Sequence, residues 1–93
     1  MNKYEIMFIV KPDVEDEARN ALIEGFKKIL TTGEGTVDNV NEWGLRDLAY
    51  EIKDYAKGYY VVLDTTTTPA NIAEFERLSR INANVLRHLT LRR

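Results

Sequence analysis

The sequence predicts an α+β domain in which two helices cover one face of a four-stranded antiparallel sheet. Two segments, residues 14–30 and 69–81, carry apolar residues at helical spacing. Four other segments are rich in β-branched and aromatic residues, a composition typical of strands. The resulting order is β-α-β-β-α-β, the split βαβ arrangement, in which right-handed crossovers place both helices on the same face of the sheet.

The first strand is expected at Lys3–Val10. Its apolar side would carry Tyr4, Ile6, Phe8 and Val10, while the other side is half polar. Because alternate residues of a strand point to opposite faces, the first set should meet the core.

The first helix should follow, with Asp13 as its N-terminal cap and Asp16 three residues later. Acidic residues crowd its first turn, and Lys27 and Lys28 lie near its end. This charge distribution is the one that the helix dipole favours. The run "TTGEG", residues 31–35, ends the helix.

The next two strands should be joined by a turn. Val37–Ile52 is expected as the second strand, with a bulge or bend near Gly44. Residues 53–58, "KDYAKG", would form the turn, and Tyr59–Thr66 is expected as the third strand because it is rich in β-branched and aromatic residues.

The second helix can be capped by Thr68, and Pro69 suits its first position. Val85–Leu91 is expected as the last strand. We therefore expect one ferredoxin-like domain over residues 1–93, with one sheet face left open. Its predicted core comprises Phe8, Leu22, Phe26, Leu30, Leu48, Phe75 and Leu78.

Composition excludes several functional classes. The net charge of −2 argues against a whole-surface nucleic-acid binder, because phosphate contacts need clustered Lys and Arg. The absence of cysteine excludes disulfides, thiolate metal sites and a cysteine nucleophile. The first apolar run, "MNKYEIMFIV", is too short and broken for a signal peptide or a membrane span, so a cytoplasmic protein is expected.

Enzyme chemistry has little support in the residues. The lone histidine, His88, lies in a predicted strand, where a partly exposed structural imidazole is commoner than a general base. The "GEG" run at Gly33–Gly35 is too short for a phosphate-binding loop. Acylphosphatases share the predicted topology, but the acids of "KPDVED" after the first strand would repel an anionic substrate. No metal or cofactor is expected.

RNA binding has two supporting features. The run "KGYYVVLD", Lys57–Asp64, partly matches a signature of the RNA recognition motif, although Val61 and Asp64 stand where aromatic residues are expected. A glycine that ends a hairpin turn before an aromatic strand is the favoured explanation of this run. The last strand and the start of the first, which neighbour each other in this topology, could combine cations into one basic edge. Those cations are Lys3, Arg87, Arg92 and Arg93.

The run "GLRDLAYEIK", Gly44–Lys53, places charged residues within a strand. It resembles the signature of the bacterial small-subunit ribosomal protein six family: glycine, any residue, a basic residue, a polar residue, Leu-Ala-Tyr, any residue, Ile, and a basic or polar residue. The opening "KYEIMFIVKPD" and the closing "INANVLRHLTLRR" are also similar to that family. Many of its members continue into an acidic C-terminal tail beyond the position of Arg93.

The resemblance implies a non-enzymatic structural component of the 30S small ribosomal subunit. Such a protein binds the central domain of 16S rRNA as a heterodimer with ribosomal protein eighteen. The expected RNA-binding residues are Lys3, Lys53, Lys57, Arg87, Arg92 and Arg93. The expected partner-binding residues are Arg46, Asp47, Tyr50 and His88.

Within the signature, Leu48 and Ile52 have core spacing, and Tyr50 is expected in the core with its hydroxyl at the rim, with stacking on RNA as the alternative. The charges of Arg46 and Asp47 would discourage wrong pairing of an edge strand and help to select a right partner. Two other functions remain open: a small-molecule regulatory domain, which metabolite-induced thermal stabilisation would reveal, and an acylphosphatase-type enzyme, which phosphate-ester turnover would reveal.

Overall fold

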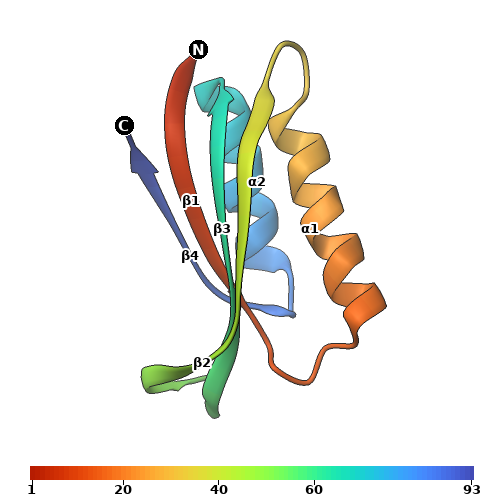
Figure 1. Cartoon of the computed structure of the whole chain (residues 1–93), viewed down its shortest axis with the longest axis vertical. Coiled ribbons are helices and arrows are strands. Elements are labelled where there is room, and N and C mark those ends of the chain that lie inside the picture. Colours follow the sequence, from red (N-terminus) through yellow and green to blue (C-terminus); the bar gives the residue numbers. More distant parts are fainter.

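The computed structural model describes residues 1–93 and contains six elements in the predicted order. They are β1 (Asn2–Val10), α1 (Asp16–Leu30), β2 (Thr36–Ile52), β3 (Tyr55–Thr67), α2 (Pro69–Ile81) and β4 (Val85–Arg92). The strands form one antiparallel sheet in the order β2-β3-β1-β4, and both helices pack on one face of it (Figure 1). The predicted ferredoxin-like fold is confirmed, with β2 and β4 as the edge strands.

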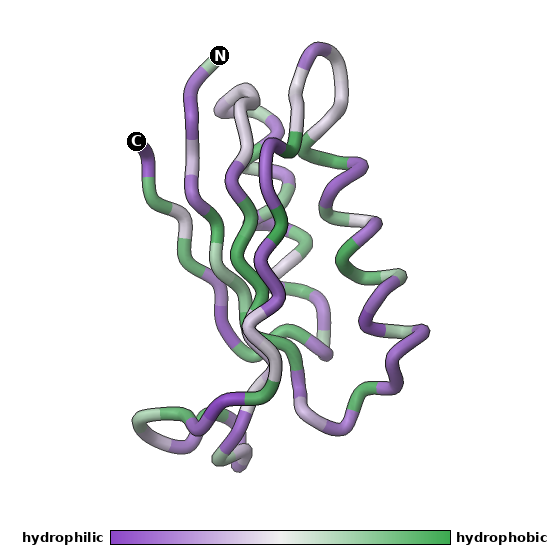
Figure 2. Tube along the Cα trace, viewed as in Figure 1, coloured by the Kyte–Doolittle hydropathy of each residue, from purple (hydrophilic) through white to green (hydrophobic).

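The core lies between the helices and the sheet. Alternate residues of β1 face it, as predicted, and the helices contribute one apolar side each; hydrophobic and hydrophilic residues alternate along α1 in Figure 2. At its centre Phe26 packs edge-to-face against Phe8 and Phe75, with ring centroids 5.0 and 4.9 Å apart. Leu30 is also buried, while Leu22 and Leu78 pack at the margin.

The start of α1 differs from the prediction. Glu15, not Asp13, occupies the N-cap position, and its side chain makes no capping hydrogen bond. Val14 packs against the core. Its N–H donates a hydrogen bond to the carbonyl oxygen of Lys11, which closes a turn before the helix. This turn delays the helix to Asp16, and the carboxylate of Asp13 instead accepts a hydrogen bond from the Tyr55 hydroxyl at 3.4 Å.

The start of α2 confirms its predicted cap. The Thr68 hydroxyl oxygen accepts a hydrogen bond of 3.2 Å from the Asn71 N–H, and Pro69 is the first helical residue. The neighbouring Thr67 is fully buried, and its hydroxyl donates to the Leu30 carbonyl at 2.7 Å. The end of β3 is thereby tied to the end of α1.

The hairpin of β2 and β3 is longer than predicted. Its turn consists only of Lys53 and Asp54, both at positive φ, so residues 55–58 belong to β3. The expected irregularity at Gly44 is confirmed, because the pairing register shifts beside it and its φ is +81°. Two further shifts lie between Val37 and Asn39 and between Asp47 and Ile52. Bulges of this kind bend a strand, and the outer end of the hairpin turns away from the rest of the sheet in Figure 1.

The link between α1 and β2 requires a glycine, which gives a first prediction. Gly35→Ala is expected to lower the free energy of unfolding by about 1–3 kcal/mol. An added methyl group would collide with the carbonyl oxygen of Leu30 and lie 2.7 Å from the hydroxyl oxygen of Thr67. Urea denaturation measures the change.

The matched control for this substitution is Gly25→Ala. An added methyl group there meets nothing within 4 Å. Alanine should stabilise helix α1 by about 0.5–1 kcal/mol relative to glycine. Equal losses of stability in the two variants would contradict the proposed collision at Gly35.

Candidate nucleic-acid and partner interface

The face of the sheet opposite the helices, which we call the open face, exposes large apolar side chains. Trp43 on β2 is 49% exposed, and Leu89 and Leu91 on β4 are 44% and 50% exposed. With Met7 and Val62 they line a groove of about 120 Å³ that crosses the sheet. Exposed apolar surface of this kind is typical of a protein-docking site.

Trp43 is held in place from two sides. Its ring stacks on Tyr60, with centroids 6.1 Å apart and planes inclined by 5°. The guanidinium carbon of Arg46 lies 5.7 Å from the Trp43 ring centroid, and Arg46 Nε donates to the Trp43 carbonyl oxygen at 3.4 Å. Arg46, a predicted partner-binding residue, therefore lies on the open face at the edge of the apolar groove.

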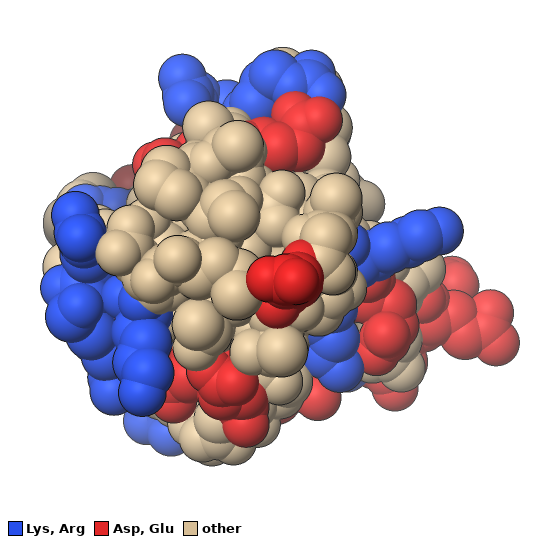
Figure 3. All heavy atoms as spheres, turned by 90° about the horizontal axis from the view of Figure 1, so that it is seen from above, with Lys and Arg blue, Asp and Glu red and all other residues tan.

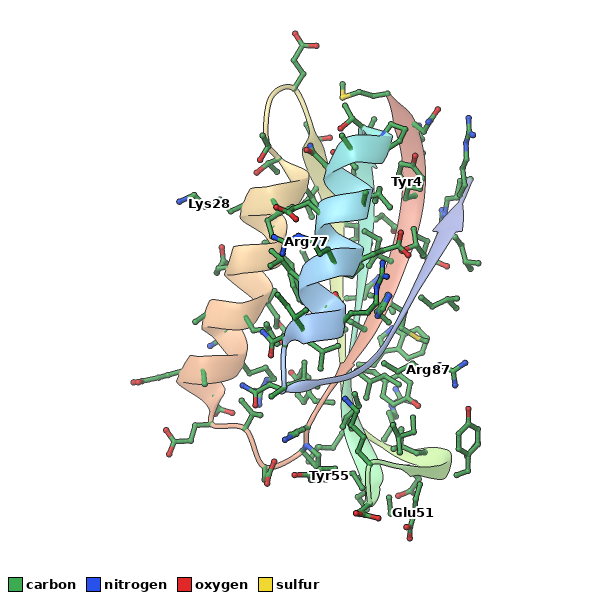
Figure 4. All side chains as sticks on the ribbon, turned by 180° about the vertical axis from the view of Figure 1, so that it is seen from behind. Tyr4, Lys28, Glu51, Tyr55, Arg77 and Arg87 are labelled. Carbon is green, nitrogen blue, oxygen red and sulfur yellow. The ribbon has the colours of Figure 1, made fainter.

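The outer end of the β2–β3 hairpin reaches across the open face to β4. Leu48 and Ile52 line an apolar hollow of about 130 Å³ together with Ile9 of β1. The Tyr50 hydroxyl oxygen accepts a hydrogen bond of 2.6 Å from Nη1 of Arg87 on β4. Figure 4 shows Arg87 on β4 near the end of the molecule that carries the hairpin. The signature run thus connects two edge strands that β3 and β1 separate.

This geometry corrects two expectations. Neither Leu48 nor Ile52 is a core residue, because both line the open-face hollow beside Ile9. Tyr50 is not buried either, since 62% of its surface is exposed. For Leu48 the physical reason is the bulge between Glu42 and Gly44, whose extra residue exchanges the two faces of the strand. Beyond this bulge Leu48 follows Arg46 onto the open face, and the break in pairing after Asp47 carries Tyr50 away from the helices.

The six predicted RNA-binding residues do not form one cluster, although Lys and Arg side chains gather on the β4 side of the molecule in Figure 3. Strands β1 and β4 are neighbours, as expected. However, Arg87 and Arg93 lie near opposite ends of β4, about 20 Å apart at the usual rise per residue of a strand. The expected basic edge is therefore divided into two groups.

The first group lies where β1 begins and β4 ends. Its Arg93 makes ion pairs with Glu5 at 2.6 Å and with Asp64 at 3.2 Å. The hydrogen bond to Glu5 and the charge of Asp64 raise the pKa of Arg93 above its usual value. Its charge is therefore largely balanced within the protein, which weakens its attraction for phosphate.

Lys3 and Arg92 complete this group but lie on different faces. Lys3 is exposed and forms no ion pair, and its strand position places it on the open face. Arg92 is paired in register with Tyr4, which faces the helices, and donates a hydrogen bond of 3.0 Å to the Asn2 side chain. The two cations cannot contact one flat surface together.

The second group lies at the hairpin end. Arg87 and Lys53, from β4 and the hairpin turn, line the same pocket. Lys57 lies on β3 with its Nζ 4.0 Å from a carboxylate oxygen of Asp47, and both side chains are exposed. Such a surface pair contributes little to stability, so Lys57 remains accessible.

The remaining predicted partner-binding residues are scattered. Asp47, which pairs in register with Lys57, directly follows Arg46 in the strand. The side chains of Asp47 and Arg46 therefore point to opposite faces of the sheet. His88 is partly buried on the helix side of β4, with its ring centroid 6.1 Å from that of Phe75. The partner-binding roles of these residues stay predictions.

Sequence reasoning missed the residues that complete both surfaces. The apolar groove depends on Trp43, Leu89 and Leu91, and the basic pocket on Ser79 and Arg80. The alternation of Leu89 and Leu91 with polar residues was the available signal for the groove. No local signal places the last turn of α2 beside the hairpin turn, because the two are far apart in sequence.

The structure contains no group of three or more His, Asp or Glu side chains placed to hold a metal ion. Neither helix has the length and hydropathy needed to cross a membrane.

Comparison with known proteins agrees with this geometry. The family model of ribosomal protein S6 matches residues 3–92. The chain is also similar to the crystal structure of 30S ribosomal protein S6 from Thermotoga maritima, with 38% sequence identity and a TM-score of 0.90 over 99% of this chain and 87% of that one. The chain therefore belongs to the ribosomal protein S6 family, whose members are structural constituents of the small ribosomal subunit.

Proposed function

We propose that this protein binds the central domain of 16S rRNA as a heterodimer with ribosomal protein eighteen, as a non-enzymatic component of the bacterial small subunit in the cytoplasm. Family membership supports the ribosomal role. The observation that carries the pairing is the open face. It exposes Trp43, Leu89 and Leu91 around one groove, and neither helix covers them. A second protein that covers this groove would remove the exposed apolar surface from water.

The charges around the groove suit a partner of mixed or basic charge. Glu5 lines the groove, and Arg46 lies at its edge beside Trp43. Complementary charges at the rim of an apolar patch select the partner and fix its orientation. In this arrangement Lys53 and Arg80, which lie outside the groove, stay available to rRNA phosphates.

The proposed pairing is tested by Trp43→Ala. This change is expected to weaken binding of purified ribosomal protein eighteen by about 2 kcal/mol or more, roughly 30-fold, because a buried tryptophan is a typical interface hot spot. Isothermal titration calorimetry measures the affinity. The matched control is Leu45→Ala, which removes an exposed apolar side chain from the same strand but on the opposite face. Equal affinities of the Trp43→Ala variant and the parent protein would count against docking on the open face.

Charge reversal separates two ways of docking. Arg46→Glu is expected to weaken the heterodimer while the fold is retained, because Arg46 lies beside Trp43. Asp47→Lys, on the opposite face of the same strand, should have a smaller effect. Similar losses in both variants would place the partner along the outer edge of β2 instead. Unchanged binding by Arg46→Glu would move the interface toward β4.

A further inference from the structure

A basic pocket lies where three elements far apart in sequence meet. The turn of the β2–β3 hairpin supplies Lys53, the last turn of α2 supplies Ser79 and Arg80, and the start of β4 supplies Arg87 and His88. The pocket has a volume of about 270 Å³. This is far above the roughly 10–15 Å³ that one water molecule needs, so a tetrahedral anion can enter.

The charge of this pocket is one-sided. No acidic residue lines it, and none of Lys53, Arg80 and Arg87 forms an ion pair. Arg93 and Lys57, by contrast, already have acidic partners. The C-terminus of α2 opposes an anion here with only about half an elementary charge, against three full positive charges. The net field of the pocket therefore favours an anion.

Ser79 adds an unused hydrogen-bonding group. Its residue is only 2% exposed, and its hydroxyl oxygen has no hydrogen-bond partner. Buried hydroxyl groups nearly always have a partner in folded proteins. An acceptor oxygen seated in the pocket would offer one, with a small movement of the side chain. Neither the helix nor the core explains a serine at this position.

We propose that this pocket binds one phosphate group of the RNA backbone, an inference that rests on the proposed function. Cationic side chains from three directions suit the several oxygens of a phosphate better than the single plane of a carboxylate, and Arg can contact such oxygens in pairs. The pocket also assigns a role to the signature run. Its glycine, Gly44, sits at the bulge that begins the bend, and its last residue, Lys53, is carried by a positive-φ turn to the pocket.

The test measures rRNA binding by the heterodimer at several salt concentrations, for Lys53→Gln, Arg80→Gln and Ser79→Ala. Loss of a phosphate-contacting cation is expected to reduce the slope of log affinity against log salt, by up to about one unit for the single phosphate that the pocket would neutralise. Ser79→Ala should weaken binding without changing the slope. The matched control is Lys28→Gln, because Lys28 is an exposed cation on α1 outside the pocket, and its slope should equal that of the parent protein.

Nuclear magnetic resonance titrations with inorganic phosphate and with a short rRNA fragment identify the occupant. Shifts centred on the amides of Ser79 and Arg87 with both probes would support the inference. Shifts with inorganic phosphate alone would overturn it, leaving a pocket for free anions. Weaker capture of ribosomal protein eighteen by Lys53→Gln, with an unchanged rRNA slope, would also overturn it, because the occupant would then be a protein carboxylate.

Failure of the pocket and failure of the proposed function give different results. If the parent heterodimer binds rRNA normally and the Lys53→Gln and Arg80→Gln slopes match that of the parent, only the pocket assignment is wrong. If the parent protein neither pairs with ribosomal protein eighteen nor binds the rRNA, the proposed function itself is wrong.

Discussion

Phe26→Ala is expected to lower the free energy of unfolding by about 3–5 kcal/mol. Phe26 is 3% exposed, and its ring packs edge-to-face on both Phe8 and Phe75. The substitution would remove the middle ring of three, which come from α1, β1 and α2. No single element can move inward to fill the resulting cavity, because the other two elements keep its walls apart. Chemical denaturation of the purified protein measures the loss.

Leu22→Ala on the same helix is the control for this prediction. Leu22 packs at the margin of the core and keeps contact with solvent. Leu22→Ala should lower the free energy of unfolding clearly less than Phe26→Ala does, because water can reach part of the space left behind. A loss below about 1 kcal/mol for Phe26→Ala would be incompatible with a fully buried, well-packed ring.

The fold was predictable because its signals are local. In β1 the alternation of Tyr4, Ile6 and Phe8 with partly polar residues specifies which face is buried, and the structure agrees. Thr68 and Pro69 mark the start of α2 through contacts within one turn. The start of α1 was misplaced because a tertiary contact, the packing of Val14 on the core, decided where the helix begins.

The surfaces were less predictable because they depend on the path of one bent hairpin. Gly44 signalled the bulge at its own position, but the register shift beyond Asp47 has no glycine or proline beside it. The bulge at Gly44 places Leu48 on the open face, and the later shift brings Tyr50 to Arg87. The RNA-binding roles of the predicted cations stay predictions, and their grouping required knowledge of where this hairpin ends.

The isolated protein is expected to bind the central domain of 16S rRNA weakly, and ribosomal protein eighteen to raise its affinity by about 100-fold or more, the scale of linked binding modules. The net charge of −2 gives little long-range attraction for RNA. The candidate cations are divided between two ends of β4, and Arg93 is already paired with Glu5 and Asp64. Few counterions would be released by this chain alone, so the partner must supply further positive charge and contact area.

Filter-binding titrations of the rRNA domain, with and without ribosomal protein eighteen, measure this gain at fixed salt. The Trp43→Ala variant is an internal control, because it should gain much less from the partner while its own cations are unchanged. The parent heterodimer should also show a steeper salt dependence than the protein alone, since more phosphates are neutralised. Tight rRNA binding by the isolated protein would refute the need for a partner. Equal gains for the parent and Trp43→Ala would show that the partner reaches the RNA without docking on the open face.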